Sequence, residues 1–190
     1  EKDIEIDDFL SFNVNSNGYL LGGYNGNFIQ LDYGQGSNEP QILWSNNIEQ
    51  GSIFSIINSK NDEPFILTYS DEKTHLLKLT NDQTSSVVWK KTFGGTKGKV
   101  RPRELLESSD GFIFTGEGNF GDLQNNGYLW VVKTDISGNQ TWKKSFSDNK
   151  VGSGESIDVT SDNGFILTGM IQNGGDFDLI LIKTDPEGNV

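Results

Sequence analysis

One phrase recurs along this chain of 190 residues, and it limits the fold more than any other feature. Its fullest copy runs from Asp110 to Lys144, with D-G-F-I-F-T-G, a polar loop, L-W-V-V-K-T-D-I-S-G-N and Q-T-W-K-K. A second copy starts at Asn163 with N-G-F-I-L-T-G and continues to L-I-L-I-K-T-D-P-E-G-N. Weaker copies start at Asn17 and Asp62, so the starts lie about 45 to 53 residues apart, which is the length of one four-stranded propeller blade.

Each unit is predicted to be a small antiparallel sheet. Asn17-Gly18, Asp110-Gly111 and Asn163-Gly164 stand between apolar runs, and this pattern predicts tight hairpins with positive φ at both residues. The apolar runs L-W-V-V and L-I-L-I are continuous and do not alternate with polar residues. Continuous runs indicate strands covered on both faces, as in sheets that stack radially.

The sequence therefore predicts an all-β fold, a single β-propeller domain of four blades with four antiparallel strands each. The blades are expected at about 11–50, 51–95, 100–147 and 153–190. The opening segment, 1–8, alternates apolar and polar residues like an outer strand, and it would complete the last blade and close the ring. The alternative is that the chain is part of a larger propeller.

The composition of the chain limits the classes of partner that can be expected. The formal net charge is −12, which repels phosphate backbones and anionic lipid headgroups, so nucleic acid is not an expected partner. No apolar run approaches the roughly 20 residues that span a bilayer, so no membrane insertion is expected. The chain has no cysteine, which excludes disulfides, thiolate metal sites and a cysteine nucleophile.

The motifs D-G-F-I-L-T-G, K-T-D-x-x-G-N and W-K-K together resemble a family of repeats in secreted and surface proteins of bacteria and archaea. The resemblance is close over about 104–190 and weak in the first half of the chain. It implies a β-propeller, an extracellular or cell-surface location and usually no assigned catalytic activity, and it carries no catalytic motif. The expected function is a non-enzymatic scaffold that binds protein or glycan. The alternatives are a structural subunit that self-assembles at the surface, and a glycan-active enzyme with a carboxylate pair.

Three sets of residues are candidates for a site. The loops expected on one face of the propeller hold the candidate ligand-binding residues Glu117, Asp122, Asn125, Asn126, Asp148 and Glu155. The basic loop K-G-K-V-R-P-R holds the candidates for docking an acidic partner or a second copy, namely Lys97, Lys99, Arg101 and Arg103. Asp176 and Asp178, beside Gly174-Gly175, are candidate ligands for a hard cation such as Ca²⁺, and no other cofactor is expected.

Other conspicuous residues are interpreted as structural. In Lys133–Asn139 and Lys183–Asn189 the aspartate is expected to cap a turn and the glycine to take the left-handed conformation, because a calcium loop needs six or more oxygens. His75 is the only histidine, so it cannot form a multi-histidine metal site, and it is expected at the start of a strand.

Tryptophan recurs at one repeat position, at Trp44, Trp89 and Trp142. Recurrence at one repeat position predicts packing between neighbouring blades, since three tryptophans distributed around a ring cannot face one sugar. Trp130, inside an apolar strand, is expected in the core as well.

Replacing Trp142 with alanine is expected to lower the free energy of unfolding by about 3–5 kcal/mol, because a buried aromatic side chain would be lost. Urea unfolding measures the change. A loss under about 1 kcal/mol would show that Trp142 is exposed, and it would favour a sugar-stacking role.

Overall fold

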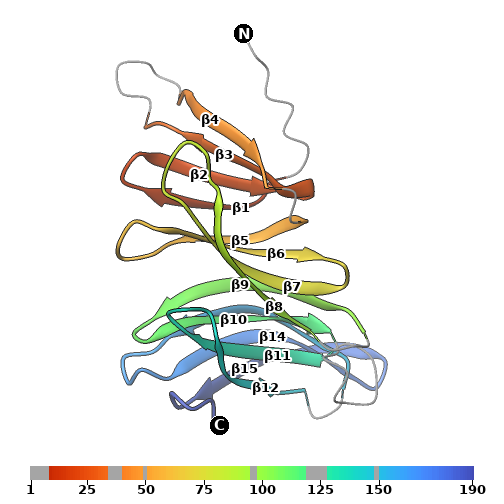
Figure 1. Cartoon of the computed structure of the whole chain (residues 1–190). Helices are drawn as coiled ribbons and strands as arrows, with labels where there is room; N and C mark the ends of the chain where they lie inside the picture. The colour runs from red at the N-terminus through yellow and green to blue at the C-terminus, as the bar shows by residue number, and fades with distance from the viewer. Residues whose placement is uncertain (1–8, 34–39, 49–50, 95–97, 119–127, 148–149) are drawn as a thin grey trace. The chain divides into compact units, whose positions relative to one another are not determined.

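The computed structural model shows an all-β chain (Figure 1). The residues that the structure describes are 9–33, 40–48, 51–94, 98–118, 128–147 and 150–190. They form strands β1 to β15 and one short 3-10 helix at Tyr24–Gly26. No helix among them is long and apolar enough to cross a bilayer.

The strands form two four-stranded sheets, β1 to β4 and β5 to β8, and one seven-stranded sheet that contains the third and fourth repeats. The first sheet contains β1 (Phe9–Asn15), β2 (Gly18–Gly23), β3 (Asn27–Leu31) and β4 (Ile42–Asn47). The second contains β5 (Ser52–Asn58), β6 (Pro64–Ser70), β7 (Lys73–Leu79) and β8 (Val87–Phe93). The third repeat contains β9 (Val100–Ser108), β10 (Gly111–Gly118), β11 (Tyr128–Asp135) and β12 (Gln140–Ser145).

The fourth repeat contains β13 (Gly152–Val159), β14 (Phe165–Asn173) and β15 (Asp176–Thr184). A single pairing of Glu117 with Ser153 joins it to the third repeat. Successive up-and-down sheets of this kind are propeller blades, and the predicted β-propeller class is confirmed. The proposed closing strand, 1–8, lies outside the described residues, so closure of a four-bladed ring stays a prediction.

The chain divides into two compact units, one of Glu1–Ser70 with His75–Lys90 and one of Asp71–Thr74 with Lys91–Val190. Each unit has a core between two successive repeats. In the first unit it contains Leu20, Phe28, Ile48, Ile53, Ile56, Ile66, Leu77 and Leu79. In the second unit it contains Ile113, Leu129, Val131, Ile157, Phe165, Leu167 and Ile182. The continuous run L-W-V-V of β11 is buried on both faces, as predicted, whereas the same prediction is wrong for L-I-L-I of β15, where Leu179 and Leu181 are exposed.

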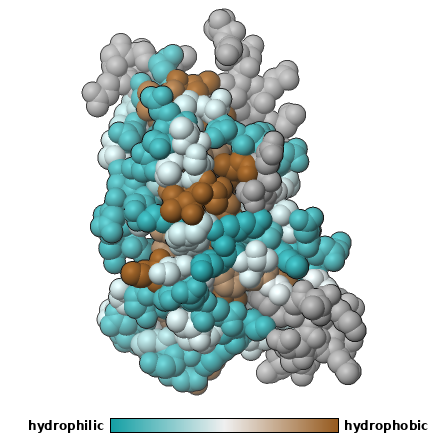
Figure 2. Space-filling model, in the orientation of Figure 1, coloured by the Kyte–Doolittle hydropathy of each residue, from teal (hydrophilic) through white to brown (hydrophobic). Residues whose placement is uncertain are grey.

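Two of the three recurring tryptophans pack against a core shared by neighbouring repeats, as predicted, whereas the ring of Trp89 lies 5.8 Å from that of Phe65 in its own repeat. Trp130 is buried. Trp44 and Trp142 are partly buried and pack against the cores of the first and second unit. Trp142 belongs to the third repeat, and its ring lies 6.1 Å from the ring of Phe165 in the fourth. The surface view shows mainly hydrophilic residues with separate hydrophobic patches (Figure 2).

The hairpin prediction is wrong in detail. At Asn17-Gly18 and Asp110-Gly111 only the glycine has positive φ, at 143° and 157°. Each glycine is the first residue of a strand, and a Cβ on Gly111 would lie 2.0 Å from the carbonyl oxygen of Thr134. Glycine is therefore required there by the close approach of the neighbouring strand. Among the described residues, two adjacent pairs have positive φ at both residues: Asn25-Gly26, at 57° and 78°, and Asp71-Glu72, at 50° and 63°.

The two K-T-D-x-x-G-N segments are turns, as predicted. Asp135 Oδ1 accepts the amide hydrogen of Asn139 at 2.8 Å, and Gly138 has φ 76°. Asp185 Oδ1 accepts that of Asn189 at 2.7 Å, and Gly188 has φ 76°. The same aspartates also accept hydrogen bonds from their asparagine side chains, which closes each turn.

The lysines of the repeats connect these turns. Lys91 Nζ donates to Asn139 Oδ1 at 2.8 Å, and Lys144 Nζ donates to Asn189 Oδ1 at 2.7 Å. In both cases the W-x-K lysine of one repeat reaches the turn of the next. Within a repeat, the lysine of K-T-D pairs with the aspartate of the preceding hairpin: Lys133 with Asp110, and Lys183 with Asp162 at 2.8 Å.

These two ion pairs differ in burial, which generates a prediction. The Lys133 side chain is 4% exposed and that of Lys183 is 45% exposed. Asp110→Asn is expected to lower the free energy of unfolding by about 1–3 kcal/mol, because it leaves a buried ammonium without a countercharge. Asp162→Asn is expected to cost less than Asp110→Asn, because its ion pair is exposed to solvent. Urea unfolding at neutral pH measures both, and equal losses would contradict the role of burial.

The contribution of Asp110 to the free energy of unfolding changes with pH in a direction that the structure predicts. The hydrogen bond from Lys133 lowers the pKa of Asp110 below its ordinary value. A carboxyl whose pKa is lower in the folded state stabilises the fold above its unfolded pKa and loses that contribution as the pH falls. The stability difference between the wild type and Asp110→Asn is therefore expected to shrink below about pH 4. A difference that grows in acid would contradict this assignment.

Candidate functional site

The inner strand of each repeat carries a β-bulge. In β9, Glu104 pairs with Thr115 and Pro102 with Gly116, so Arg103 is the extra residue. In β13, Ser156 pairs with Thr168 and Gly154 with Gly169, so the extra residue is Glu155. Leu10 in β1 and Phe54 in β5 are the corresponding extra residues of the first unit. A bulge interrupts the ladder and redirects a side chain.

In the second unit, the two bulges bring opposite charges together. Arg103 Nε lies 3.6 Å from Glu155 Oε2, although the two residues belong to different repeats. This distance is too long for a hydrogen bond, and the buried Nε has no hydrogen-bond acceptor among the described residues. The Ser153 hydroxyl donates to Glu155 Oε1 from the same strand.

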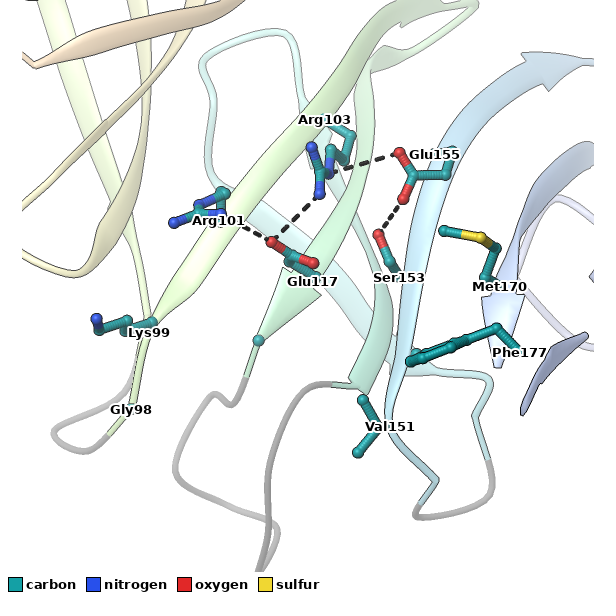
Figure 3. A pocket seen from close by; sticks show the side chains of 12 residues that line it. Gly98, Lys99, Arg101, Arg103, Glu117, Val151, Ser153, Glu155, Met170 and Phe177 are labelled. Carbon is teal, nitrogen blue, oxygen red and sulfur yellow. Dashed lines mark hydrogen bonds and ion pairs between the residues drawn. The ribbon is translucent and has the colours of Figure 1, made fainter. Parts of the chain in front are cut away.

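A second carboxylate extends the network (Figure 3). Glu117 Oε1 accepts a hydrogen bond from Arg101 Nη1 at 3.2 Å and lies 3.3 Å from Arg103 Nη2. Arg103 thus lies between two carboxylates, and all four charged side chains are partly exposed. An alternating network of this kind fixes the position of both arginine side chains.

The network lines an open cavity of about 590 Å³. Apolar side chains from the fourth repeat, Met170 and Phe177, form part of the wall together with Val151. The lining residues are Gly98, Lys99, Arg101, Arg103, Glu117, Gly118, Val151, Gly152, Ser153, Glu155, Met170 and Phe177. All of them belong to the second unit.

In β1 and β9, the residue after the bulge ties neighbouring repeats together. Glu104 Oε2 accepts hydrogen bonds from the Ser156 hydroxyl and from the amide of Ile157, both at 2.7 Å. In the first unit, Ser11 Oγ accepts the amide hydrogen of Ile56 at 3.0 Å. A side chain of one repeat thus satisfies an amide next to the bulge of the following repeat. In the second unit this bond holds β13, and with it Glu155, against β9.

The structure unites residues that the sequence placed in separate sets. Glu117 and Glu155 came from the ligand-binding set, and Lys99, Arg101 and Arg103 from the docking set. The expectation that these residues lie in loops is wrong for four of them. Arg101 and Arg103 belong to β9, Glu117 to β10 and Glu155 to β13, because strand pairing continues beyond the repeated motif. Asp122, Asn125, Asn126, Asp148 and Lys97 lie outside the described residues.

The candidate cation ligands lie elsewhere. Asp176 and Asp178 are in β15 and not in a loop, because β14 and β15 pair up to Asn173 and Asp176. Both are exposed, and Asp178 Oδ2 accepts a hydrogen bond from Asn173 Nδ2 at 2.9 Å. The part of the chain that the structure describes holds no group of three or more metal-ligating side chains. A Ca²⁺ site at the two aspartates stays a prediction.

His75 lies near the start of β7, as expected, and it is buried. Its Nε2 lies 3.0 Å from the hydroxyl oxygen of Ser70, across the Asp71-Glu72 turn. This contact links the two ends of the hairpin.

Comparison with known proteins gives one named structural neighbour. No protein-family model and no curated protein sequence matches the chain. Among solved structures, the chain is similar to the WD40 β-propeller domain of Doa1, with 16% identity and a TM-score of 0.44. The match covers 93% of this chain and 69% of that domain's chain.

The charge network generates a stability prediction. Arg103→Gln is expected to lower the free energy of unfolding by about 1–2 kcal/mol, because two partly buried carboxylates lose the cation between them. Arg101→Gln is the matched control and is expected to cost less than about 1 kcal/mol, since the Arg101 side chain in its pair with Glu117 is 44% exposed. Urea unfolding of both variants measures the difference. A larger loss for Arg101→Gln would contradict the bridging role of Arg103.

Proposed function

We propose that this protein is a non-enzymatic binding module, outside the cell or at the cell surface, whose ligand occupies the cavity of the second unit. The observation that carries the proposal is the mixed lining of that cavity. Cations, carboxylates, a hydroxyl and apolar side chains from two repeats surround one open space of about 590 Å³. Binding pockets typically combine apolar walls with a few fixed polar groups and have volumes of about 300–1,000 Å³.

Of the two expected ligand classes, the cavity favours a glycan over a protein. Its volume suits a short piece of a glycan, whereas a protein interface typically buries about 800 Å² on each partner. Sugar hydroxyls donate and accept hydrogen bonds, and Arg103, Ser153 and Glu155 offer both functions side by side. Phe177 supplies an apolar surface for the C–H face of a sugar ring.

The charges favour a glycan that carries carboxylates. Three cations and two carboxylates line the cavity in a chain whose net charge is −12. Arg101 and Lys99 extend the basic side of the lining. Arginine binds carboxylates through charge-assisted and often bidentate hydrogen bonds. A uronate-bearing glycan is therefore the proposed ligand.

The arrangement of Glu117 and Glu155 supports binding over catalysis. Glycoside hydrolysis needs one carboxyl that delivers a proton and a second that acts as base or nucleophile. Here Arg103 contacts both carboxylates, and each serves to position the guanidinium. The extracellular location is supported by the resemblance of the repeats to those of secreted and surface proteins.

A glycan array with neutral and uronate-bearing glycans tests the proposal. The wild type is expected to bind the uronate-bearing glycans, and its binding should weaken as salt screens the cations. Arg103→Gln and Phe177→Ala are each expected to weaken binding about tenfold or more, equivalent to about 1.4 kcal/mol. Lys60→Gln, an exposed lysine of the first unit, is the matched control and should bind like the wild type.

Two results would overturn the proposal. Equal binding by the wild type and both cavity variants would place the ligand elsewhere, and no binding to any glycan would reject the ligand class. Shortening of a bound glycan during incubation, abolished in Glu155→Gln, would show that the module is an enzyme.

A further inference from the structure

The guanidinium group of Arg103 has two donors that can bind one carboxylate together. Nε–H and one N–H of Nη2 point in the same direction, and their spacing matches the two oxygens of a carboxylate. We call this pair of donors the edge of Arg103. In the structure the two donors face different carboxylates (Figure 3). Nη2 lies 3.3 Å from Glu117 Oε1, and Nε lies 3.6 Å from Glu155 Oε2.

One donor of the edge lacks an acceptor. Arg103 Nε is buried and has no hydrogen-bond acceptor among the described residues, so neither glutamate binds both donors. Glu155 Oε2 stands at the distance of an ion pair and does not accept the Nε hydrogen. A buried N–H without an acceptor is unfavourable, and a bound group that supplies the acceptor removes this cost. The edge therefore favours a ligand that brings a carboxylate.

Of the two glutamates, Glu155 is held less firmly. Glu117 pairs in register with Arg101 and also accepts a hydrogen bond from the Arg101 side chain at 3.2 Å. Glu155 is the extra residue of the bulge in β13, so its backbone has no partner in that ladder. Its carboxylate accepts a hydrogen bond from Ser153 of the same strand, and its side chain is 39% exposed. Glu155 is thus the carboxylate that an incoming ligand can displace.

We propose that Glu155 competes with the ligand for the edge of Arg103 and thereby makes the cavity selective for glycans that carry a carboxylate. The carboxylate of a uronate takes both donors of the edge, supplies the acceptor that Nε lacks and displaces Glu155. A neutral sugar offers no charged group that can replace Glu155 at both donors, so Glu155 stays in place. This inference rests on the proposed function, because it assigns the carboxylate-binding part of the same cavity.

The competition has a consequence with a definite sign. When the state that can bind is populated for about a tenth of the time, the apparent dissociation constant is about tenfold above the intrinsic one. Removing the charge of Glu155 therefore tightens the binding of a uronate. If Glu155 instead bound the ligand directly, its removal would weaken binding.

NMR titration of the chain 1–190 with methyl β-D-glucuronide and methyl β-D-glucoside tests the inference. The two probes differ only in that the first carries a carboxylate where the second carries a hydroxymethyl group. Glu155→Gln and Glu155→Ala are each expected to lower the dissociation constant of the glucuronide about tenfold and to leave that of the glucoside unchanged. Glu187→Gln makes the same change of charge in an exposed turn of the second unit and should bind like the wild type. Circular dichroism checks that every variant is folded.

The Nε–Hε signal of Arg103, identified by its loss in Arg103→Gln, reports on the edge directly. Glucuronide binding is expected to shift this signal in the wild type and in both Glu155 variants. A signal that stays unchanged while the glucuronide binds would place the carboxylate elsewhere and overturn the inference.

The outcomes separate the inference from the proposed function. If the wild type binds the glucuronide and both Glu155 variants bind it equally well or more weakly, the inference alone is overturned. If the variants bind the glucuronide while the wild type binds no glycan on the array, the inference is supported and the proposed function is rejected. If none of these proteins binds the glucuronide, the inference is overturned whatever the array shows.

Discussion

The structure depends on the packing of one sheet face against the next. A four-stranded sheet cannot bury both of its faces alone, so a repeat gains a core only from its neighbour. In both units the buried apolar residues come from two successive repeats. The polar contacts follow the same rule, since Glu104 accepts the amide hydrogen of Ile157, and Lys144 holds the turn of the next repeat through Asn189.

This dependence explains why the phrase that recurs in the repeats predicts the fold but does not predict the ligand. Its aspartates close turns, its lysines join turns and hairpins, and its tryptophan covers the neighbouring core. Function has to come from positions where the repeats differ. The bulge is such a position, because its backbone is kept while its side chain changes from Leu10 and Phe54 to Arg103 and Glu155. The same β-bulge thus holds apolar side chains in the first unit and the charged side chains of the cavity in the second.

Local patterns predicted much of the fold. Strand order, the turns at Asp135 and Asp185 and the packing of Trp142 followed from spacing and residue type. The hairpin glycines were assigned to the correct segments for the wrong reason, because the approach of a neighbouring strand cannot be seen in a dipeptide. Arg101 and Glu117 were expected in loops, because charged residues next to glycine or proline are typical of loops. They lie in strands because β9 and β10 pair with each other at these positions.

The sequence by itself determined the all-β class, the repeat length and the residues that close the turns, because each rests on interactions between residues near one another in the chain. It also marked Glu117, Glu155, Arg101 and Arg103 as candidates. Only the tertiary structure decided that these four residues share one cavity and that Arg103 faces Glu155 of the next repeat. The physical reason is that a β-bulge and the stacking of successive sheets set side-chain positions across repeats, and neither leaves a periodic signal in the chain.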